Sequence, residues 1–197
     1  MDAPLSPAPP RSGRQREVFL QPGEFFVGDA QHRIRTLLGS CVSITLWCAA
    51  RRMGAMSHFL LAERGRPRRA PETPDGRYAD EALRLMLDLL ARRDVKPADC
   101  QAKIFGGGEM FPENKPSGQM GIGRRNGEAA RRLLLGHGIH VASESLFGNG
   151  HRQIIFDVGS GDVWARQLAV QAESPALPPL PFPLGAPAPS APPSTSS

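Results

Sequence analysis

A cysteine and a histidine are the two residues of this chain whose types and spacing suggest catalysis. Cys41 closes a Gly-Ser-Cys triplet that begins at Gly39, and His58 follows seventeen residues later. A thiol beside an imidazole can lose its proton to become a nucleophile, and the imidazole can then protonate a departing amine. Because Gly39 has no side chain, a substrate could approach the backbone beside the thiol closely. The pair predicts cysteine-dependent chemistry that needs no metal.

Each of these residues also has an ordinary structural interpretation. A cysteine that opens an apolar strand is commonly a small buried hydrophobe, and a single histidine is commonly a hydrogen-bonded core residue. Cys48 and Cys100 have no histidine at a telling spacing, and we interpret them as structural. Cys41 and His58 together are more informative than either alone, because the elements that carry them are expected to be neighbours.

Two strands joined by a hairpin would bring the cysteine and the histidine together. Residues 40–47 alternate between apolar and polar side chains, and residues 55–61 have the composition of a second strand. The polar connection between them is short enough for a hairpin. If the hairpin centre lies at residues 49–50, Cys41 and His58 are directly paired, with Cβ atoms roughly 4.5–5.5 Å apart. A one-residue slip would put them on opposite faces.

Apolar periodicity predicts two helices and further strands after the hairpin. Residues 78–93 present an apolar stripe at helical spacing, and residues 126–135 form a second expected helix with Asn126 as its N-cap. The other expected strands cover residues 102–105, 139–145, 152–158 and 161–166. This order predicts an α/β (α+β) layered fold in which the helices pack on a mixed β-sheet.

Composition divides the chain into one folded domain and two ends. Residues 1–15 and 172–197 are rich in proline and serine and poor in large apolar side chains, so we expect both to be disordered. Residues 16–171 are the expected folded domain. No leader-like apolar segment opens the sequence, and no apolar run has the length of a membrane span, so membrane insertion is not expected.

The formal net charge of +5 favours acidic partners. The densest basic run, Arg64, Arg66, Arg68 and Arg69, is interpreted as a solvated loop. No aromatic residues alternate with these arginines, so nucleic-acid binding is not expected. Three cysteines without a CxxC motif argue against both a disulfide framework and a cysteine-based zinc site. They fit a reducing compartment such as the cytoplasm.

Two other groups of residues are weaker candidates for a site. His137 and His140 lie on either side of the break formed by Gly136 and Gly138, and no further ligand completes a metal set at a recognised spacing. The glycines at 106–108 are followed by no Lys-Ser or Lys-Thr pair, so they do not form a P-loop. We expect neither a metal nor another cofactor.

Five motifs in order resemble the chemoreceptor glutamine deamidases, the CheD family. They are TLLGSCV at 36–42, GAMSHFLL at 54–61, YAD at 78–80, KIFGGGEMF at 103–111 and IGRRN at 122–126. The resemblance extends from about Val18 to Arg166, and the order of five motifs makes it specific. It implies a layered fold similar to the catalytic domain of cytotoxic necrotizing factor toxins.

The resemblance also implies roles for particular residues. Cys41 is the implied nucleophile, His58 the implied base and Thr36 the implied third catalytic residue, with Arg35 as an alternative at that position. The implied substrate-binding or oxyanion positions are Gly39, Ser40, Gly107 and Gly108, and Met110 and Phe111 are expected nearby. Backbone N–H groups of these segments would stabilise the negative oxygen of the intermediate.

Members of this family deamidate glutamines on the cytoplasmic helical hairpin of methyl-accepting chemotaxis receptors. The resemblance therefore implies a protein-glutamine glutaminase that works through a Cys41 thioester in the cytoplasm. Some members also hydrolyse glutamyl methyl esters, and some bind a CheC-type phosphatase. A non-catalytic regulator that binds such a phosphatase or the receptor stays an alternative, as does a cysteine hydrolase or transglutaminase-like enzyme with other substrates.

Overall fold

The computed structural model describes residues 15–65, 72–110 and 120–168. The two ends that the sequence predicts to be disordered lie outside these ranges, with the exception of Gln15. The side-chain amide of Gln15 donates a hydrogen bond to Asp157 at 2.8 Å, so this residue contacts the folded domain.

The described residues form nine strands, two α-helices and one short 3₁₀ helix. The strands are β1 (Arg16–Phe19), β2 (Phe25–Asp29), β3 (His32–Leu38), β4 (Val42–Cys48), β5 (Met53–Ser57), β6 (Gln101–Gly106), β7 (His140–Leu146), β8 (Arg152–Asp157) and β9 (Val163–Gln167). The helices are α1 (Ala79–Ala91) and α2 (Ile122–Gly136), and the 3₁₀ helix is η1 (Pro97–Asp99).

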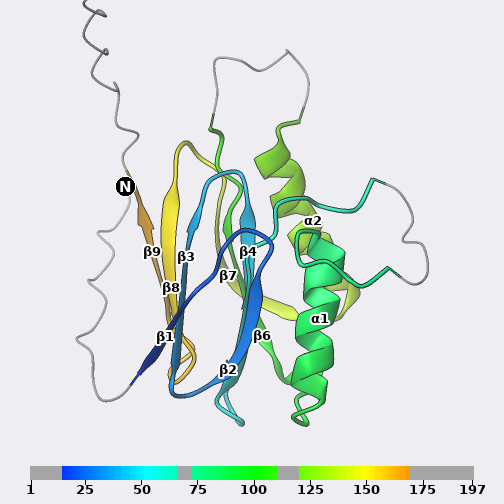
Figure 1. Ribbon diagram of the computed structural model, residues 1–197, viewed down its shortest axis with the longest axis vertical. Coiled ribbons are helices and arrows are strands. Elements are labelled where there is room, and N and C mark those ends of the chain that lie inside the picture. The colour runs from blue at the N-terminus through cyan, green and yellow to red at the C-terminus, as the bar shows by residue number, and fades with distance from the viewer. Residues whose placement is uncertain (1–14, 66–71, 111–119, 169–197) are drawn as a thin grey trace, which may run out of the picture.

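The strands form two mixed sheets, and the helices cover one of them. The first sheet has the order β1-β3-β8-β9 and the second has the order β2-β5-β4-β6-β7. Figure 1 shows three layers: the first sheet, the second sheet and then the two helices. The chain passes from the first sheet to the second between β3 and β4, through residues 39–41. Cys41 therefore lies in one of the segments that cross between the sheets.

Strands β4 and β5 lie between two hydrophobic layers, because alternate side chains of a strand point to opposite faces of the sheet. Val42, Ile44 and Leu46 face the helices, where they pack with residues of α1 and α2 such as Leu83 and Leu134. The layer between the sheets contains Ile34, Leu38, Met56, Ile154 and Phe156, all fully buried. Burying each such side chain contributes roughly 1.5–3 kcal/mol.

Both expected helices are present, with different boundaries. Helix α1 buries Leu83, Met86 and Leu90, as its apolar stripe predicts. Helix α2 begins at Ile122, four residues earlier than expected, and its N-cap is Gly121. The interpretation of Asn126 as an N-cap is therefore wrong: this residue lies in the second turn, on the buried face of the helix.

The α+β layered class is confirmed, although the sequence predicts one sheet and the strands form two. The expected hairpin is present, because β4 and β5 pair antiparallel. Strands β1, β2 and β3 are not predicted from the sequence. Strands β1 and β3 supply two of the four strands of the additional sheet, and β2 is an edge strand of the other sheet. Among the described residues, neither helix has both the length and the hydrophobicity needed to cross a membrane.

Candidate active site

Three segments meet where the two sheets come together. Thr36 lies near the end of β3 in the first sheet, and Cys41 lies in the crossing segment before β4. His58 follows β5 directly in the second sheet, so its position is set by that strand. The turn after β1 binds the backbone of His58 through two hydrogen bonds. His58 N–H donates to the Glu24 carbonyl at 2.9 Å, and Gly23 N–H donates to the His58 carbonyl at 2.7 Å.

A chain of hydrogen bonds fixes the orientation of the His58 ring. The Thr36 hydroxyl donates to the Leu20 carbonyl at 2.7 Å, and its oxygen lies 2.8 Å from His58 Nδ1. A hydroxyl has one hydrogen, and here that hydrogen is donated to Leu20. The Nδ1 atom must therefore be the donor toward Thr36, which assigns the proton of neutral His58 to Nδ1 and leaves Nε2 as an acceptor.

The acceptor atom of His58 has no partner. His58 is 2% exposed, and its Nε2 atom is buried without a hydrogen bond. Burial lowers the pKa of His58 below 6.5, more than the Leu20 carbonyl and the Glu24 carboxylate raise it. The ring is therefore neutral at pH 7, with a lone pair available to take a proton.

The Cys41 thiol is half-buried and packs against the layer between the sheets. Burial raises the pKa of Cys41 above 9.0, while its own backbone N–H lowers it. Together with the lowered pKa of His58, this favours a neutral thiol and a neutral imidazole in the resting protein over a thiolate–imidazolium pair. The thiol makes no hydrogen bond to His58 in this structure, and such bonds commonly tighten only when substrate binds.

The register of the hairpin differs from the predicted one by two residues. Thr45 pairs with Met56, and Val42 pairs with Phe59 through two backbone hydrogen bonds of 3.1 and 3.0 Å. The direct pairing of Cys41 with His58 is therefore wrong. Because a shift of two residues preserves the face, the two side chains still lie on the same side of the sheet, as diagonal neighbours.

The third position has two candidates in the sequence, and only one contacts His58. Thr36 is 1% exposed and bonds the imidazole directly. Arg35 points to the other face of β3, where its guanidinium lies 5.3 Å from the centre of the Phe19 ring. The geometry thus joins Thr36, and not Arg35, to the Cys41–His58 pair.

The glycines after β6 hold the crossing segment by its carbonyl groups. Gly107 N–H donates to the Cys41 carbonyl at 2.8 Å, and Gly108 N–H donates to the Gly39 carbonyl at 2.9 Å. These two N–H groups are thus already used and do not point at a substrate. Among the described residues, no backbone carbonyl accepts a hydrogen bond from Ser40 N–H or Cys41 N–H, so these two donors remain available.

The close contact between these segments explains the glycine sequence. Gly106 and Gly107 have φ values of 108° and 68°, which favour glycine. A Cβ atom on Gly106 would lie 2.3 Å from the Cys41 carbonyl oxygen. A Cβ atom on Gly39 would lie 2.9 Å from Met110 Sδ, so Met110 is near the thiol segment as expected. Phe111, expected beside it, lies outside the described residues.

The sequence does not identify two polar residues that lie near the site, the buried Asn126 and the half-buried Arg152. The Asn126 side-chain amide donates to the carbonyls of Ser40 and Leu60. The Arg152 guanidinium donates to the carbonyls of Gly106, Ser145 and Phe147, and burial lowers its pKa. Asn126 falls on the buried stripe of α2, and a polar residue on such a stripe needs partners, which is a signal available in the sequence.

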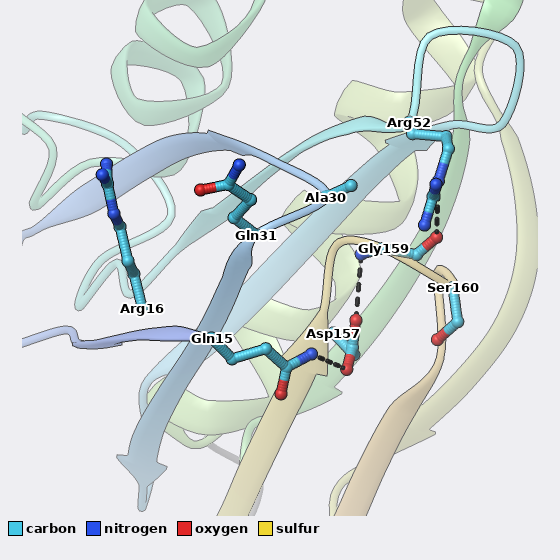
Figure 2. A pocket seen from close by; sticks show the side chains of 8 residues that line it. All are labelled: Gln15, Arg16, Ala30, Gln31, Arg52, Asp157, Gly159 and Ser160. Carbon is cyan, nitrogen blue, oxygen red and sulfur yellow. Dashed lines mark hydrogen bonds between the residues drawn. The ribbon is translucent and has the colours of Figure 1, made fainter. Parts of the chain in front are cut away.

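A separate cavity lies at the opposite ends of the strands. It has a volume of about 940 Å³ and lies among the β2–β3, β4–β5 and β8–β9 turns. Figure 2 shows the residues that line it: Gln15, Arg16, Ala30, Gln31, Arg52, Asp157, Gly159 and Ser160. Its lining contains neither a cysteine nor a histidine, and Cys41 and His58 lie at the other end of β4 and β5. We therefore do not assign the candidate site to this cavity.

The residues that lie where the two sheets meet can perform acyl transfer. A thiol can attack a carbonyl carbon, an unprotonated imidazole nitrogen on the same sheet face can take its proton, and two free N–H groups can stabilise an oxyanion. Among the described residues, no group of three or more His, Cys, Asp or Glu side chains could hold a metal ion. This combination of fold and site is that of a thiol-containing α+β protein with hydrolase-like chemistry.

Comparisons with known proteins identify the family. Residues 60–167 match the family described as CheD, chemotactic sensory transduction. A relative named probable chemoreceptor glutamine deamidase CheD 2, from Albidiferax ferrireducens, is 61% identical over 80% of this chain and 91% of its own. A relative named probable chemoreceptor glutamine deamidase CheD 3, from Dechloromonas aromatica, is 49% identical over 75% of this chain and 85% of its own. The chain belongs to the CheD family.

The solved structure of the hypothetical protein YfiH from Bacillus licheniformis matches 61% of this chain and 49% of its own. Its TM-score of 0.41 and sequence identity of 17% are too low to support an inference about fold or function.

Proposed function

We propose that this protein is a chemoreceptor glutamine deamidase that uses Cys41 as nucleophile, His58 as general base and Thr36 as the residue that orients His58. Membership of the CheD family supports the reaction and the substrate class. The receptor segment that the family modifies is cytoplasmic, and a free thiol requires a reducing compartment, so we place the reaction in the cytoplasm.

One observation carries the assignment of roles. The hydrogen bonds from His58 to Thr36 and from Thr36 to Leu20 fix the imidazole with Nε2 unprotonated and unpartnered. An unpaired buried acceptor costs stability, on the order of 1–3 kcal/mol. A base that must receive a proton during reaction accounts for this cost.

The first half of the reaction forms a thioester. Cys41 Sγ attacks the carboxamide carbon of a receptor glutamine, and the thiol proton passes to His58 Nε2. The carbonyl oxygen becomes an oxyanion, which the N–H groups of Ser40 and Cys41 stabilise. His58 then gives its proton to the amide nitrogen, the C–N bond breaks, and ammonia leaves.

The second half of the reaction releases glutamate. A water molecule gives a proton to His58 Nε2 and attacks the thioester carbon. The C–S bond breaks, and the proton returns to Cys41 Sγ. Thr36 keeps the protonated imidazole in place, because its oxygen accepts the Nδ1 hydrogen throughout the cycle. The new carboxylate is a negative charge on the receptor and a site for methylation.

The experiment that tests this function is mass spectrometry of a receptor cytoplasmic fragment incubated with the full chain. Deamidation is expected to convert particular glutamines to glutamates and to release ammonia in equal amount. Cross-linking with loss of ammonia would instead indicate a transglutaminase-like enzyme. A folded protein that binds the fragment or a CheC-type phosphatase, but changes no glutamine, would contradict the proposal and favour a non-catalytic regulator.

A further inference from the structure

Asn126 connects the segment that carries Cys41 with the segment that follows His58. The residue is 1% exposed and lies on the inner face of α2. Its amide nitrogen donates to the Ser40 carbonyl at 3.1 Å and to the Leu60 carbonyl at 2.7 Å. These carbonyls are far from Asn126 in the sequence, so both contacts depend on the tertiary fold.

A polar residue at this position is unusual for a helix that only packs on a sheet. The same face of α2 is otherwise made of small or apolar residues: Gly123, Gly127, Ala130 and Leu134. Burying an amide is unfavourable unless its hydrogen bonds are formed, and an apolar residue would avoid this cost. The two bonds of Asn126 therefore need an explanation beyond helix packing.

The bond to Ser40 determines the direction of the Cys41 N–H group. In a trans peptide, the carbonyl and the N–H of one peptide unit point in opposite directions. When the Ser40 carbonyl points toward Asn126, the Cys41 N–H points away from it. No carbonyl of the described residues accepts a hydrogen bond from this N–H. The group instead lies near the Cys41 sulfur, where it favours the thiolate form.

The bonds on either side hold the rest of the Cys41 segment. The Gly39 carbonyl accepts from Gly108 and the Cys41 carbonyl accepts from Gly107. The Ser40 carbonyl between them has Asn126 as its one donor among the described residues. Asn126 therefore completes a set of three anchored carbonyls, and it alone controls the peptide whose N–H lies beside the reacting sulfur.

We propose that Asn126 is a positioning residue that orients the Ser40–Cys41 peptide so that Cys41 N–H can donate to the oxyanion of the tetrahedral intermediate. This inference rests on the proposed function. It assigns to helix α2 a part in transition-state stabilisation, with no contact between Asn126 and the reacting atoms.

Loss of Asn126 should leave the Cys41–His58 relation in place. Val42 follows Cys41 and Phe59 follows His58, and the backbones of Val42 and Phe59 exchange two hydrogen bonds. Thr36 holds the imidazole independently. The thiol should therefore keep its reactivity toward a small alkylating agent, because alkylation at sp³ carbon forms no oxyanion. Deamidation and alkylation should separate in an Asn126 variant.

The test compares wild type with Asn126→Ala and Asn126→Asp. The alanine variant removes both donors, and the aspartate variant keeps the shape of the side chain while replacing its donor by a carboxylate, so the second remains informative if the first unfolds. For each protein, kcat and KM are measured on the receptor cytoplasmic fragment. The rate of iodoacetamide labelling at Cys41 is followed by mass spectrometry, with circular dichroism as the folding control.

We expect kcat to fall roughly 10²–10³-fold, as it does when an oxyanion donor is lost. Labelling of Cys41 should stay within about threefold of wild type, because burial, the larger influence on the pKa of the thiol, is unchanged and the backbone N–H is the smaller one. An unchanged kcat would overturn the inference, and so would equal losses of kcat and labelling, which would mean that Asn126 only keeps the thiol and base in place. A wild-type protein that labels at Cys41 but deamidates no glutamine would instead overturn the proposed function.

Discussion

The two ends of the layer between the sheets each hold a buried ionisable side chain, Asp157 and His58, and these two side chains differ in how their polar atoms are paired. At the end near the β8–β9 turn, Asp157 accepts hydrogen bonds from Gln15, Arg33 and the Gly159 N–H at 2.8, 3.1 and 2.9 Å. At the other end, His58 Nε2 has no partner, and the thiol of Cys41 makes no hydrogen bond to His58. The first end contains the cavity of about 940 Å³, and the second contains the thiol and the imidazole that we propose to be catalytic.

This difference is the reason for placing the proposed site at His58. The carboxylate of Asp157 has hydrogen bonds to both of its oxygens, so it has little capacity left for a ligand. His58 has one nitrogen bonded and the other free, and the bonded nitrogen fixes the direction of the free one. A free reactive atom on a rigid support is more informative here than cavity volume.

The largest effect is expected from Cys41→Ala. Deamidation of the receptor fragment should fall by at least about 10⁴-fold, because no other group can form the thioester. His58→Ala should be nearly as damaging, and the double variant little worse than either, since the two residues act as a unit. Mass spectrometry of the fragment measures the rate, and circular dichroism confirms folding.

Cys48→Ala is the matched control for this substitution. Cys48 is 2% exposed and packs in the layer between the second sheet and the helices, away from His58. Its replacement should lower stability by about 1 kcal/mol and leave kcat unchanged. Deamidation at the wild-type rate by folded Cys41→Ala would contradict the mechanism.

The pairing of Cys41 and His58 is only partly predictable from sequence. The predicted hairpin places Cys41 and His58 on one face, and the observed register of β4 and β5 preserves that face. The exact register depends on the turn between β4 and β5, in which Arg52 adopts a φ of 49°. A left-handed conformation is expected of glycine or asparagine, so an arginine gives no signal for where this turn is centred.

The network around His58 is less accessible to sequence reasoning. Thr36 is implied by family resemblance, but its bond to Leu20 depends on how β1 and the following turn pack beside β3. The alternation of Ile34, Thr36 and Leu38 in β3 is a strand pattern that the sequence does contain. Asn126 could be recognised as polar on an apolar stripe, whereas its partners, 66 and 86 residues away, could not.

Alkylation of the three cysteines tests the protonation state of the Cys41 thiol. Cys41 should react with iodoacetamide well before Cys48 and Cys100, because only Cys41 is partly exposed. Burial, together with nearby Cys48 and Asp99, raises the pKa of Cys100 to about 11. Since burial also raises the pKa of Cys41 above 9.0, its labelling rate should increase roughly tenfold per pH unit between pH 6 and pH 9.

Deamidation should follow a different pH dependence from labelling. It requires neutral His58, whose pKa is lowered, so the rate should be lost only as the pH falls below about 6.5 and should be level above it. The control for the labelling experiment is the urea-unfolded protein, in which all three thiols should react alike. A labelling rate that is already level between pH 5 and pH 8 would indicate a preformed thiolate–imidazolium pair and contradict the neutral resting state.

Thr36→Val tests the orienting bond with an intermediate effect. Valine has nearly the shape of threonine but cannot accept the Nδ1 hydrogen, so the imidazole loses its fixed tautomer. We expect kcat to fall roughly 10-fold to 10²-fold, part of the 10²–10⁴ that a general base supplies. The rate on the receptor fragment is the measurement, with substrate saturating so that kcat is separated from KM.

Thr45→Val is the control that makes this result specific. Thr45 is 2% exposed and its hydroxyl also donates to a backbone carbonyl, that of Lys103. Both variants should lose about 1 kcal/mol of stability from the missing hydrogen bond. If the two variants lost the same amount of activity, Thr36 would have a structural role only.

The smallest effect on activity is expected from Asp157→Asn, at the end opposite the thiol. Burial alone would raise the pKa of Asp157, but the hydrogen bonds from Gln15, Arg33 and the Gly159 N–H lower it below 3.8. A carboxylate with a lowered pKa stabilises the fold above its unfolded pKa, and this contribution is lost as the pH falls below about 4. The asparagine variant should lose about 2 kcal/mol at pH 7, because the Arg33 guanidinium keeps its buried position without an anionic partner. It should also show less of the acid destabilisation of wild type.

Its kcat on the receptor fragment should stay within about twofold of wild type once the folded fraction is taken into account. Urea unfolding at pH 3 to 7 measures the first effect, and Asp162→Asn, an exposed aspartate in the same turn, is the control that should change neither quantity. A large fall in kcat for folded Asp157→Asn would mean that the two ends are coupled through the strands that join them, and that the contrast between the paired carboxylate of Asp157 and the free Nε2 of His58 does not describe how this protein works.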